Sequence, residues 1–344
     1  MKTKQITKML MFLVLSLMVM VAMLPGRVDA AAKPGKVSIK TVKCVTKNKV
    51  KVSWKKLTKN VKKYQVFKKS GKAKWKTAKT VSRSKSSLTT TVKYGTKTKF
   101  KVRAVNGKKK GKFSKVKSIT INRIKLSADT VSMEEGSSKT LAVRNAVGAV
   151  SWSTDNSRIA TVSNGTVQGI SPGVATVTAA NRGQKVSCTV YVNGYLNVDE
   201  AYTLLNKFRT GANVWQWNEG NKTKTYFNKP GAAMLNPLAA DKSLEETAKV
   251  RAKELPVLFD HTRPNGESCF AAFPDNLWAA GENIAMGQSS AKEVTEDWEE
   301  TNDNYGGQGH RRNMLSEEFN SVGIACYMYE GVRYWVQDFG YVSE

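Results

Sequence analysis

Two histidines and one carboxylate motif in the C-terminal third of this chain are the residues best suited to chemistry. His261 opens the segment HTRPNG, Glu282 lies in GENIA, and His310 lies in GHRRNML. The chain of 344 residues has no other histidine. Imidazoles and a carboxylate that converge in a cleft suit a divalent metal, zinc most readily. His261 and His310 would then be metal ligands, and Glu282 would act on a bound water molecule.

The same three residues allow readings without a metal. They could form a hydrogen-bonded cluster whose imidazoles titrate near neutral pH, or a polar network that only braces the cleft. As catalytic candidates we name Glu282, His261 and His310. The sequence shows no activated nucleophile, since it lacks a GxSxG motif and pairs no cysteine with a histidine in a motif. We therefore favour binding over catalysis, and a metal-assisted hydrolase is the alternative.

Helices and strands alternate around these motifs. Leu244, Ala248, Ala252 and Leu255 recur at helical spacing, and Ser290 begins a further helix. The segments 322–328 and 334–339 read as strands joined by a turn at 330–331. Residues 194–344 are therefore predicted to form a layered α/β domain.

Several motifs in order resemble the CAP superfamily, also called SCP-like (cysteine-rich secretory, antigen 5 and pathogenesis-related proteins). The segment 238–255, HTRPNG, GENIA, GHRRNML and the closing YWVQDFG carry this resemblance over about residues 197–342. It implies a three-layer α/β/α sandwich with a cleft lined by histidines and acidic residues. Arg263 and Asn265 would shape the rim of a cleft that takes a metal, a small molecule or a lipid.

One position departs from the family pattern. Eukaryotic members carry a second acidic residue three places after the helix tryptophan, and here that place after Trp298 is Thr301. The neighbouring Asp297, Glu299 and Glu300 are expected to point to other parts of the helix turn. The resemblance therefore transfers His261, Glu282 and His310, without the second carboxylate.

Four cysteines are too few for a disulfide framework, and no CxxC pair suggests a thiolate zinc site. Cys269 and Cys326 fall within one predicted domain and could pair after export. Cys188 alternates with valines on a strand, which predicts a buried small residue. The pattern around Cys44 decides nothing.

The positive charge of the chain is concentrated in one segment. Residues 31–122 contain 31 Lys and Arg and no Asp or Glu, whereas residues 194–344 carry a net charge of −8. Val50, Val52 and Trp54 alternate with polar residues, which indicates a half-buried strand rather than a disordered tail. The segment resembles a fibronectin type III domain, with Thr98 where a corner tyrosine is usual.

A segment whose charges are all positive favours a polyanionic partner. An N-terminal basic cluster, an apolar run and a small-residue site ending at Ala30 predict a cleaved signal peptide over residues 1–30. Export makes nucleic acid an unlikely target and favours anionic cell-wall polymers or surfaces. No later stretch is predicted to cross a membrane.

Residues 123–193 contain short strands separated by Asn-Gly and Pro-Gly turns, the pattern of an all-β sandwich. They resemble a bacterial Ig-like group 2 domain and hold no catalytic cluster, so we expect a spacer. The sequence thus predicts two β-sandwiches followed by an α/β/α domain in a secreted, wall-associated bacterial protein. A purely adhesive protein with an inert cleft is a further alternative.

Overall fold

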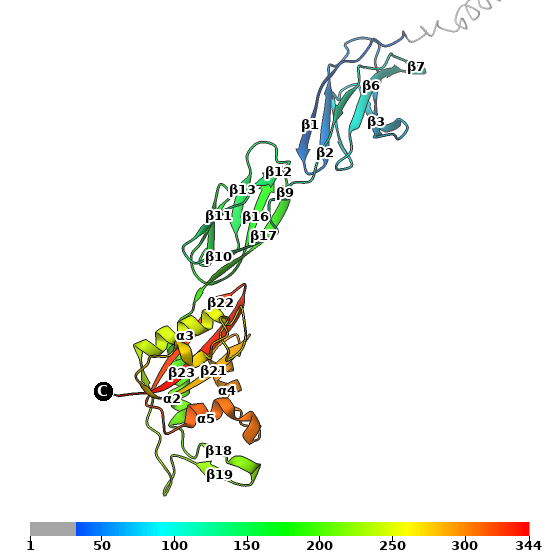
Figure 1. The fold of residues 1–344 in the computed structure, drawn as a ribbon. Coiled ribbons are helices and arrows are strands. Elements are labelled where there is room, and N and C mark those ends of the chain that lie inside the picture. Colours follow the sequence, from blue (N-terminus) through cyan, green and yellow to red (C-terminus); the bar gives the residue numbers. More distant parts are fainter. Residues whose placement is uncertain (1–31, 344) are drawn as a thin grey trace, which may run out of the picture. The chain divides into compact units, whose positions relative to one another are not determined.

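The computed structural model describes residues 32–343 in two compact units, one ending at Arg123 and the next beginning at Ile124 (Figure 1). The predicted signal peptide, residues 1–30, lies outside the described residues. Within the described part of the chain, no helix has the length and apolar character needed to cross a membrane.

The first unit is a sandwich of two antiparallel sheets. One sheet has the order β1-β2-β5 and the other β4-β3-β6-β7, with β8 also paired to β6. The strands are β1 (Ile39–Thr46), β2 (Lys49–Trp54), β3 (Lys63–Ser70), β4 (Lys76–Ser82), β5 (Ser87–Thr91), β6 (Thr98–Asn106), β7 (Lys109–Lys110) and β8 (Lys117–Ile119).

Alternation along these strands builds the core of this sandwich, as the sequence predicts. Val50, Val52 and Trp54 are fully buried in β2, whereas Lys51 between them is exposed. The Trp54 ring lies 5.5 Å from that of Tyr64, whose hydroxyl accepts the backbone N–H of Leu57 at 2.7 Å. The lysines therefore lie on the solvent-facing side of the strands, so their charges do not have to be buried when the core forms.

The second unit begins with a smaller set of strands that form the Ig-like part. β16 pairs with β13 and β17, β10 lies parallel to β17, and β15 joins β11 and β14. The strands are β9 (Lys125–Leu126), β10 (Thr130–Glu134), β11 (Ser138–Thr140), β12 (Val143–Arg144), β13 (Ser151–Thr154), β14 (Ala160–Ser163), β15 (Thr166–Gly169), β16 (Gly173–Asn181) and β17 (Gln184–Tyr195).

β17 continues from the Ig-like part into the next sheet. Its residues up to Val192 pair with β16, and Gly194 and Tyr195 pair with β22 (Ser321–Tyr329). The hydroxyl of Tyr327 in β22 also donates to Glu134 at 2.9 Å. The boundary predicted at residues 193 and 194 therefore falls inside one strand.

The C-terminal part contains a sheet with the order β22-β23-β21, and β20 pairs with β22. Glu330 and Gly331, both with positive φ, form the turn between β22 and β23. Besides β22, the strands here are β18 (Trp215–Trp217), β19 (Lys224–Tyr226), β20 (Ala239–Ala240), β21 (Leu277–Met286) and β23 (Val332–Val342).

Helices cover both faces of this sheet, which confirms the predicted α/β/α fold. On one face, Ala248 and Ala252 pack against Ile284, Ala325 and Val336. The other face packs its apolar side chains against a separate group of helices. The first face carries α3 (Lys242–Glu254). The second face carries α2 (Asp199–Arg209), α4 (Ala291–Glu299) and α5 (Gly309–Leu315). Three short 3-10 helices are η1 (Glu219–Asn221), η2 (Cys269–Ala272) and η3 (Tyr305–Gly307).

Gly323 in β22 is the point of closest approach between this sheet and α3. A Cβ atom added there would lie 2.0 Å from the backbone carbonyl carbon of Leu244. We expect Gly323→Ala to lower the free energy of unfolding by about 1–3 kcal/mol, because helix backbone must move to make room. Urea unfolding followed by tryptophan fluorescence measures this.

Gly309→Ala is the matched control, since a Cβ atom at Gly309 meets nothing within 4 Å. Equal stability of the two variants would contradict the close packing of α3 on β22.

Candidate functional site

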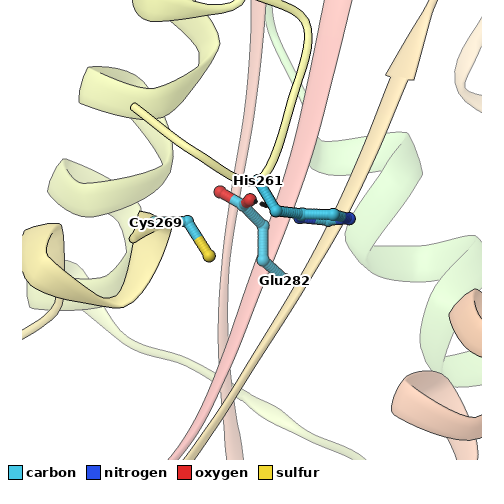
Figure 2. Close-up of side chains that lie close together, drawn as sticks. All are labelled: His261, Cys269 and Glu282. Carbon is cyan, nitrogen blue, oxygen red and sulfur yellow. Dashed lines mark hydrogen bonds and ion pairs between the residues drawn. The ribbon is translucent and has the colours of Figure 1, made fainter. Parts of the chain in front are cut away.

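His261 lies on the loop that follows α3 and faces Glu282 of β21 (Figure 2). Its Nδ1 atom is 2.7 Å from Oε1 of Glu282. The side chain of His261 is 55% exposed, whereas that of Glu282 is 1% exposed. The pair therefore joins a buried carboxylate to an imidazole that is open to solvent.

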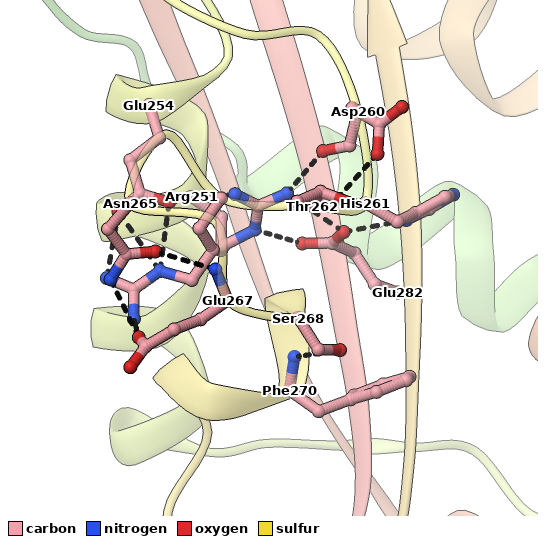
Figure 3. A network of polar contacts seen from close by, with 11 residues as sticks. Arg251, Glu254, Asp260, His261, Thr262, Asn265, Glu267, Ser268, Phe270 and Glu282 are labelled. Carbon is pink, nitrogen blue, oxygen red and sulfur yellow. Dashed lines mark hydrogen bonds and ion pairs between the residues drawn. The ribbon is translucent and has the colours of Figure 1, made fainter.

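Arg251 of α3 holds Glu282 from the other side (Figure 3). Its Nε donates to Oε2 of Glu282 at 2.7 Å, and one Nη donates to Oε1 at 3.2 Å. Burial alone would raise the pKa of Glu282, but the hydrogen bonds from His261 and Arg251 outweigh it and hold that pKa below its usual range. Glu282 is thus an ionised acceptor, and a lowered pKa makes it a weak base.

The loop after His261 closes on itself. The backbone N–H of Cys269 donates to the carbonyl of His261 at 2.7 Å, and Thr262 and Ser268 form an isolated bridge. Arg251 also donates to the carbonyl of Asp260 at 2.7 Å. The chain from His261 to Cys269 therefore forms a short hairpin, which places both residues next to Glu282.

Arg263 and Asn265 serve this loop. Arg263 pairs with Glu254 of α3 at 2.8 Å, and the Asn265 side chain bonds both the side chain and the backbone N–H of Glu267 (Figure 3). Neither residue lines the groove described below. Arg263 thus fixes the loop to α3, and Asn265 holds the loop on itself. Their predicted place at a cleft rim stays a prediction.

His310, the second predicted histidine, forms a separate pair with Glu300. Its Nδ1 lies 2.5 Å from Oε1 of Glu300, and the other oxygen accepts the backbone N–H of Arg311 at 3.2 Å. Glu300 caps the C-terminus of α4 in the left-handed conformation, with φ of 45°.

The expectation that Glu300 points elsewhere was wrong. The left-handed residue turns the chain out of the helix, so Glu300, two places after Trp298, supplies a carboxylate to the second histidine. Thr301 instead accepts a hydrogen bond from Arg311 at 3.3 Å.

A groove of about 340 Å³ lies beside β21 at the His310–Glu300 pair. It combines apolar and acidic side chains, and β21 is the last strand of its sheet. The residues that line it are Phe259, Ile284, Ala285, Met286, Gln288, Asp297, Trp298, Glu300, Asp303 and His310. A ligand with both an apolar part and a polar or cationic group would suit this surface.

The metal-ligating side chains that lie closest together include one of the two histidines. Among the described residues, the one group of three or more metal-ligating side chains is His261, Cys269 and Glu282, without His310. An ion held by His261 and His310 together, as the sequence suggested, stays a prediction.

Glu282 and Asn283 are consecutive in β21 and reach opposite layers. Asn283, fully buried, donates to the carbonyl of His310 at 3.2 Å and accepts from the Asn313 side chain at 2.8 Å. Successive side chains of a strand point to opposite faces. Glu282 therefore connects β21 to α3 on one face, and Asn283 connects it to α5 on the other face.

Comparison with known families agrees with this geometry. Residues 202–339 match the family model described as the cysteine-rich secretory protein family, and residues 120–190 match that of the bacterial Ig-like domain (group 2). This chain carries a CAP domain. The resemblances to the CAP superfamily and to the bacterial Ig-like group 2 domain, inferred from the sequence, are confirmed.

Among curated proteins, the CAP domain is similar to the uncharacterized protein YkwD of Bacillus subtilis (strain 168). The two are 33% identical over 110 residues, which cover 30% of this chain and 40% of YkwD. The matched stretch is thus less than half of that relative. A CAP domain together with a bacterial Ig-like domain indicates a protein of the bacterial cell surface.

Solved structures of fibronectin domains are also similar to this chain. The fragment FN1–FN3 of chicken CNTN1 is 17% identical, with a TM-score of 0.25, over 47% of this chain and 67% of the fragment. A fibronectin domain of human collagen XX is 15% identical, with a TM-score of 0.23, over 26% of this chain and 99% of that domain. The pairing of its own strands is what identifies residues 32–122 as a β-sandwich.

The cysteines of the CAP domain do not pair. Cys269 and Cys326 are both free thiols and both buried. Cys326 belongs to the core under α2 and α4, whereas the turn of Cys269 is bonded to α3 through Thr247. The sheet separates the two thiols, so the disulfide that the sequence left open is absent.

Arg251 and Glu300 are the functional residues that the sequence analysis missed. Arg251 lies seven residues after Leu244 and three after Ala248, on the apolar face of the predicted helix. A cation at such a position signals a buried carboxylate partner. Glu300 left no comparable signal, since its role depends on one left-handed residue at the end of α4.

Arg251→Met tests whether the buried pair supports the CAP domain. The side chains of Arg251 and Glu282 are 0% and 1% exposed, so the loss of one partner leaves the other buried without compensation. We expect the free energy of unfolding to fall by about 3–5 kcal/mol, and Arg251→Met with Glu282→Leu to recover much of it.

Lys249→Met on the same helix provides the control, because Lys249 pairs with Glu245 at 2.8 Å in a partly exposed bridge. Its effect should stay below about 1 kcal/mol. Similar losses for the two single variants in urea unfolding would contradict the role of Arg251.

Proposed function

We propose that this chain is an exported cell-surface protein that attaches to anionic wall polymers and presents the CAP groove as a binding site. The observation that carries attachment is the charge of residues 31–122, where 31 basic residues stand without one acidic residue. The sandwich is folded, so the lysines are displayed on a fixed surface rather than on a loose tail. The Ig-like part acts as a spacer.

Aromatic rings support part of this basic surface. The Lys101 ammonium lies 4.4 Å from the ring centre of Trp75 and 4.0 Å from that of Phe113, and Arg103 lies 4.8 Å from Phe113. Such contacts hold cations in place on the sheet of β3 and β6. Polyanions bound to such a surface are released by salt, because small ions screen exposed charges.

The CAP domain is proposed to bind a ligand in its groove rather than to catalyse a reaction. Glu282 is held ionised by Arg251, and burial, together with the neighbouring Glu282, raises the pKa of the Cys269 thiol to about 12. The thiolate is the nucleophilic form, so this cysteine is a poor nucleophile at neutral pH. The apolar and acidic lining favours a small amphipathic or lipid-like ligand.

Attachment is tested by co-sedimentation of the full chain with purified Gram-positive cell walls. A variant with the exposed residues Lys108, Lys109, Lys110 and Lys112 changed to Gln should bind at least about tenfold more weakly at low salt, and salt should release the parent protein.

Lys207, Lys222, Lys242 and Lys292, all exposed in the CAP domain, give the charge-matched control when changed to Gln. Equal losses in the two variants, or binding unaffected by salt, would refute attachment through residues 31–122. Walls stripped of teichoic acid separate polymer binding from binding to the glycan itself.

Hydrolysis is the second candidate because of the His310–Glu300 pair in the groove. A carboxylate on Nδ1 fixes the tautomer of His310 and leaves Nε2 able to accept a proton. If the groove hydrolyses peptides, cleavage of fluorescent casein should fall at least about 100-fold in His310→Ala and Glu300→Gln. Cleavage that survives both changes, or no cleavage by the parent protein, would reject this candidate.

A further inference from the structure

The hairpin of residues 261–269 brings three different metal-ligating groups to one point beside α3. A nitrogen of His261, the sulfur of Cys269 and an oxygen of Glu282 all lie within 4.8 Å of one another (Figure 2). Ligand atoms around a tetrahedral zinc ion are roughly 3.3–3.8 Å apart, given zinc–ligand bonds of about 2.0–2.3 Å. Small side-chain rotations would therefore suffice to close the three groups around one ion.

We propose that His261, Cys269 and Glu282 form a zinc-binding site, with solvent as the remaining ligand. Imidazole, thiolate and carboxylate are the three protein ligands that zinc prefers, and three of them leave an open position. This site uses one of the two histidines, and none of its three residues lines the groove at His310.

Arg251 fits the role of an outer partner in this site. Its strongest bond goes to Oε2 of Glu282 at 2.7 Å, and its contact with Oε1 is longer, at 3.2 Å. Oε1, which now faces His261, is the oxygen that could bind an ion. A ligating carboxylate is commonly oriented by a donor on its other oxygen, and Arg251 supplies that donor.

Asp338 is a second buried carboxyl group beside Glu282. It is the cross-strand partner of Glu282, it is fully buried, and neither of its carboxylate oxygens has a hydrogen-bond partner. A carboxyl group buried without a donor is costly, and a cation held at Glu282 would stabilise its ionised form.

An ion can reach the proposed site from solvent, and the protons displaced by its binding can be accounted for. The imidazole of His261 is 55% exposed, so an ion can enter from solvent, whereas Cys269 is 2% exposed. Binding would release the thiol proton of Cys269 to solvent and move the Nδ1 proton of neutral His261 to Nε2. One proton is then released for each ion bound.

The test titrates the purified full chain, freed of metal with a chelator, with Zn²⁺ and with Co²⁺. We expect one ion per chain, and with Co²⁺ a near-ultraviolet thiolate-to-metal band that requires a bound sulfur. His261→Ala and Cys269→Ser should each weaken binding at least about 100-fold, and the second should abolish the band.

Two variants act as matched controls. Cys326→Ser removes a buried thiol on the other face of the sheet, and His310→Ala removes the histidine that the proposed site does not use. Both should keep the ion and the thiolate band. Thermal unfolding in chelator shows whether each variant is folded, and the exposed His261 offers a ligand change that leaves the core intact.

Three results would overturn the proposed site. The first is that the chain does not bind one ion stoichiometrically, and the second is that Co²⁺ binds without a thiolate band. The third is that the ion still binds in His261→Ala and Cys269→Ser. Binding lost in His310→Ala but kept in Cys269→Ser would instead assign the ion to the two histidines. Wall attachment through the basic sandwich is measured separately and does not depend on any of these outcomes.

Discussion

The ion pair between Arg251 and Glu282 is the constraint on which the CAP site depends. Both side chains are almost completely removed from water, so each charge must be matched within the protein. Arg251 uses its remaining donors on Glu254 and on the carbonyl of Asp260. One guanidinium thereby fixes α3, β21 and the start of the His261 loop relative to one another, and the imidazole position follows from that arrangement.

The place of β21 at the edge of the sheet explains why the site has two parts. Glu282 points to the α3 layer and holds His261, whereas Asn283 points to the α5 layer and holds the backbone of His310. Each histidine has its own carboxylate, Glu282 or Glu300. The two imidazoles therefore have different surroundings, although one strand positions both.

Most of the fold could be predicted from the sequence because burial repeats with the period of each element. Ala248 and Ala252 mark the buried stripe of α3, and Val50 and Val52 mark the inner face of β2. The signal peptide remains a prediction, as do secretion and wall association. The site was harder to predict, because its pairs depend on single backbone events rather than on a repeated pattern.

Two such events decide the site. The left-handed Glu300 at the end of α4 supplies the second carboxylate, and spacing from Trp298 cannot reveal it. The hairpin after His261 turns Arg263 toward Glu254 and returns Cys269 to Glu282, which local composition does not specify. The pairing of Cys269 with Cys326 was open in the sequence because residue types do not show which face of a sheet a thiol occupies.

The division of charge between the units also has a functional consequence. Residues 31–122 attract polyanions, whereas the CAP domain is acidic overall and its groove carries Asp297, Glu300 and Asp303. An anionic polymer would therefore be drawn to the basic sandwich and repelled from the groove. If the chain attaches as proposed, the acidic groove would stay open to ligands of other chemistry, and attachment and ligand binding would not compete for one surface.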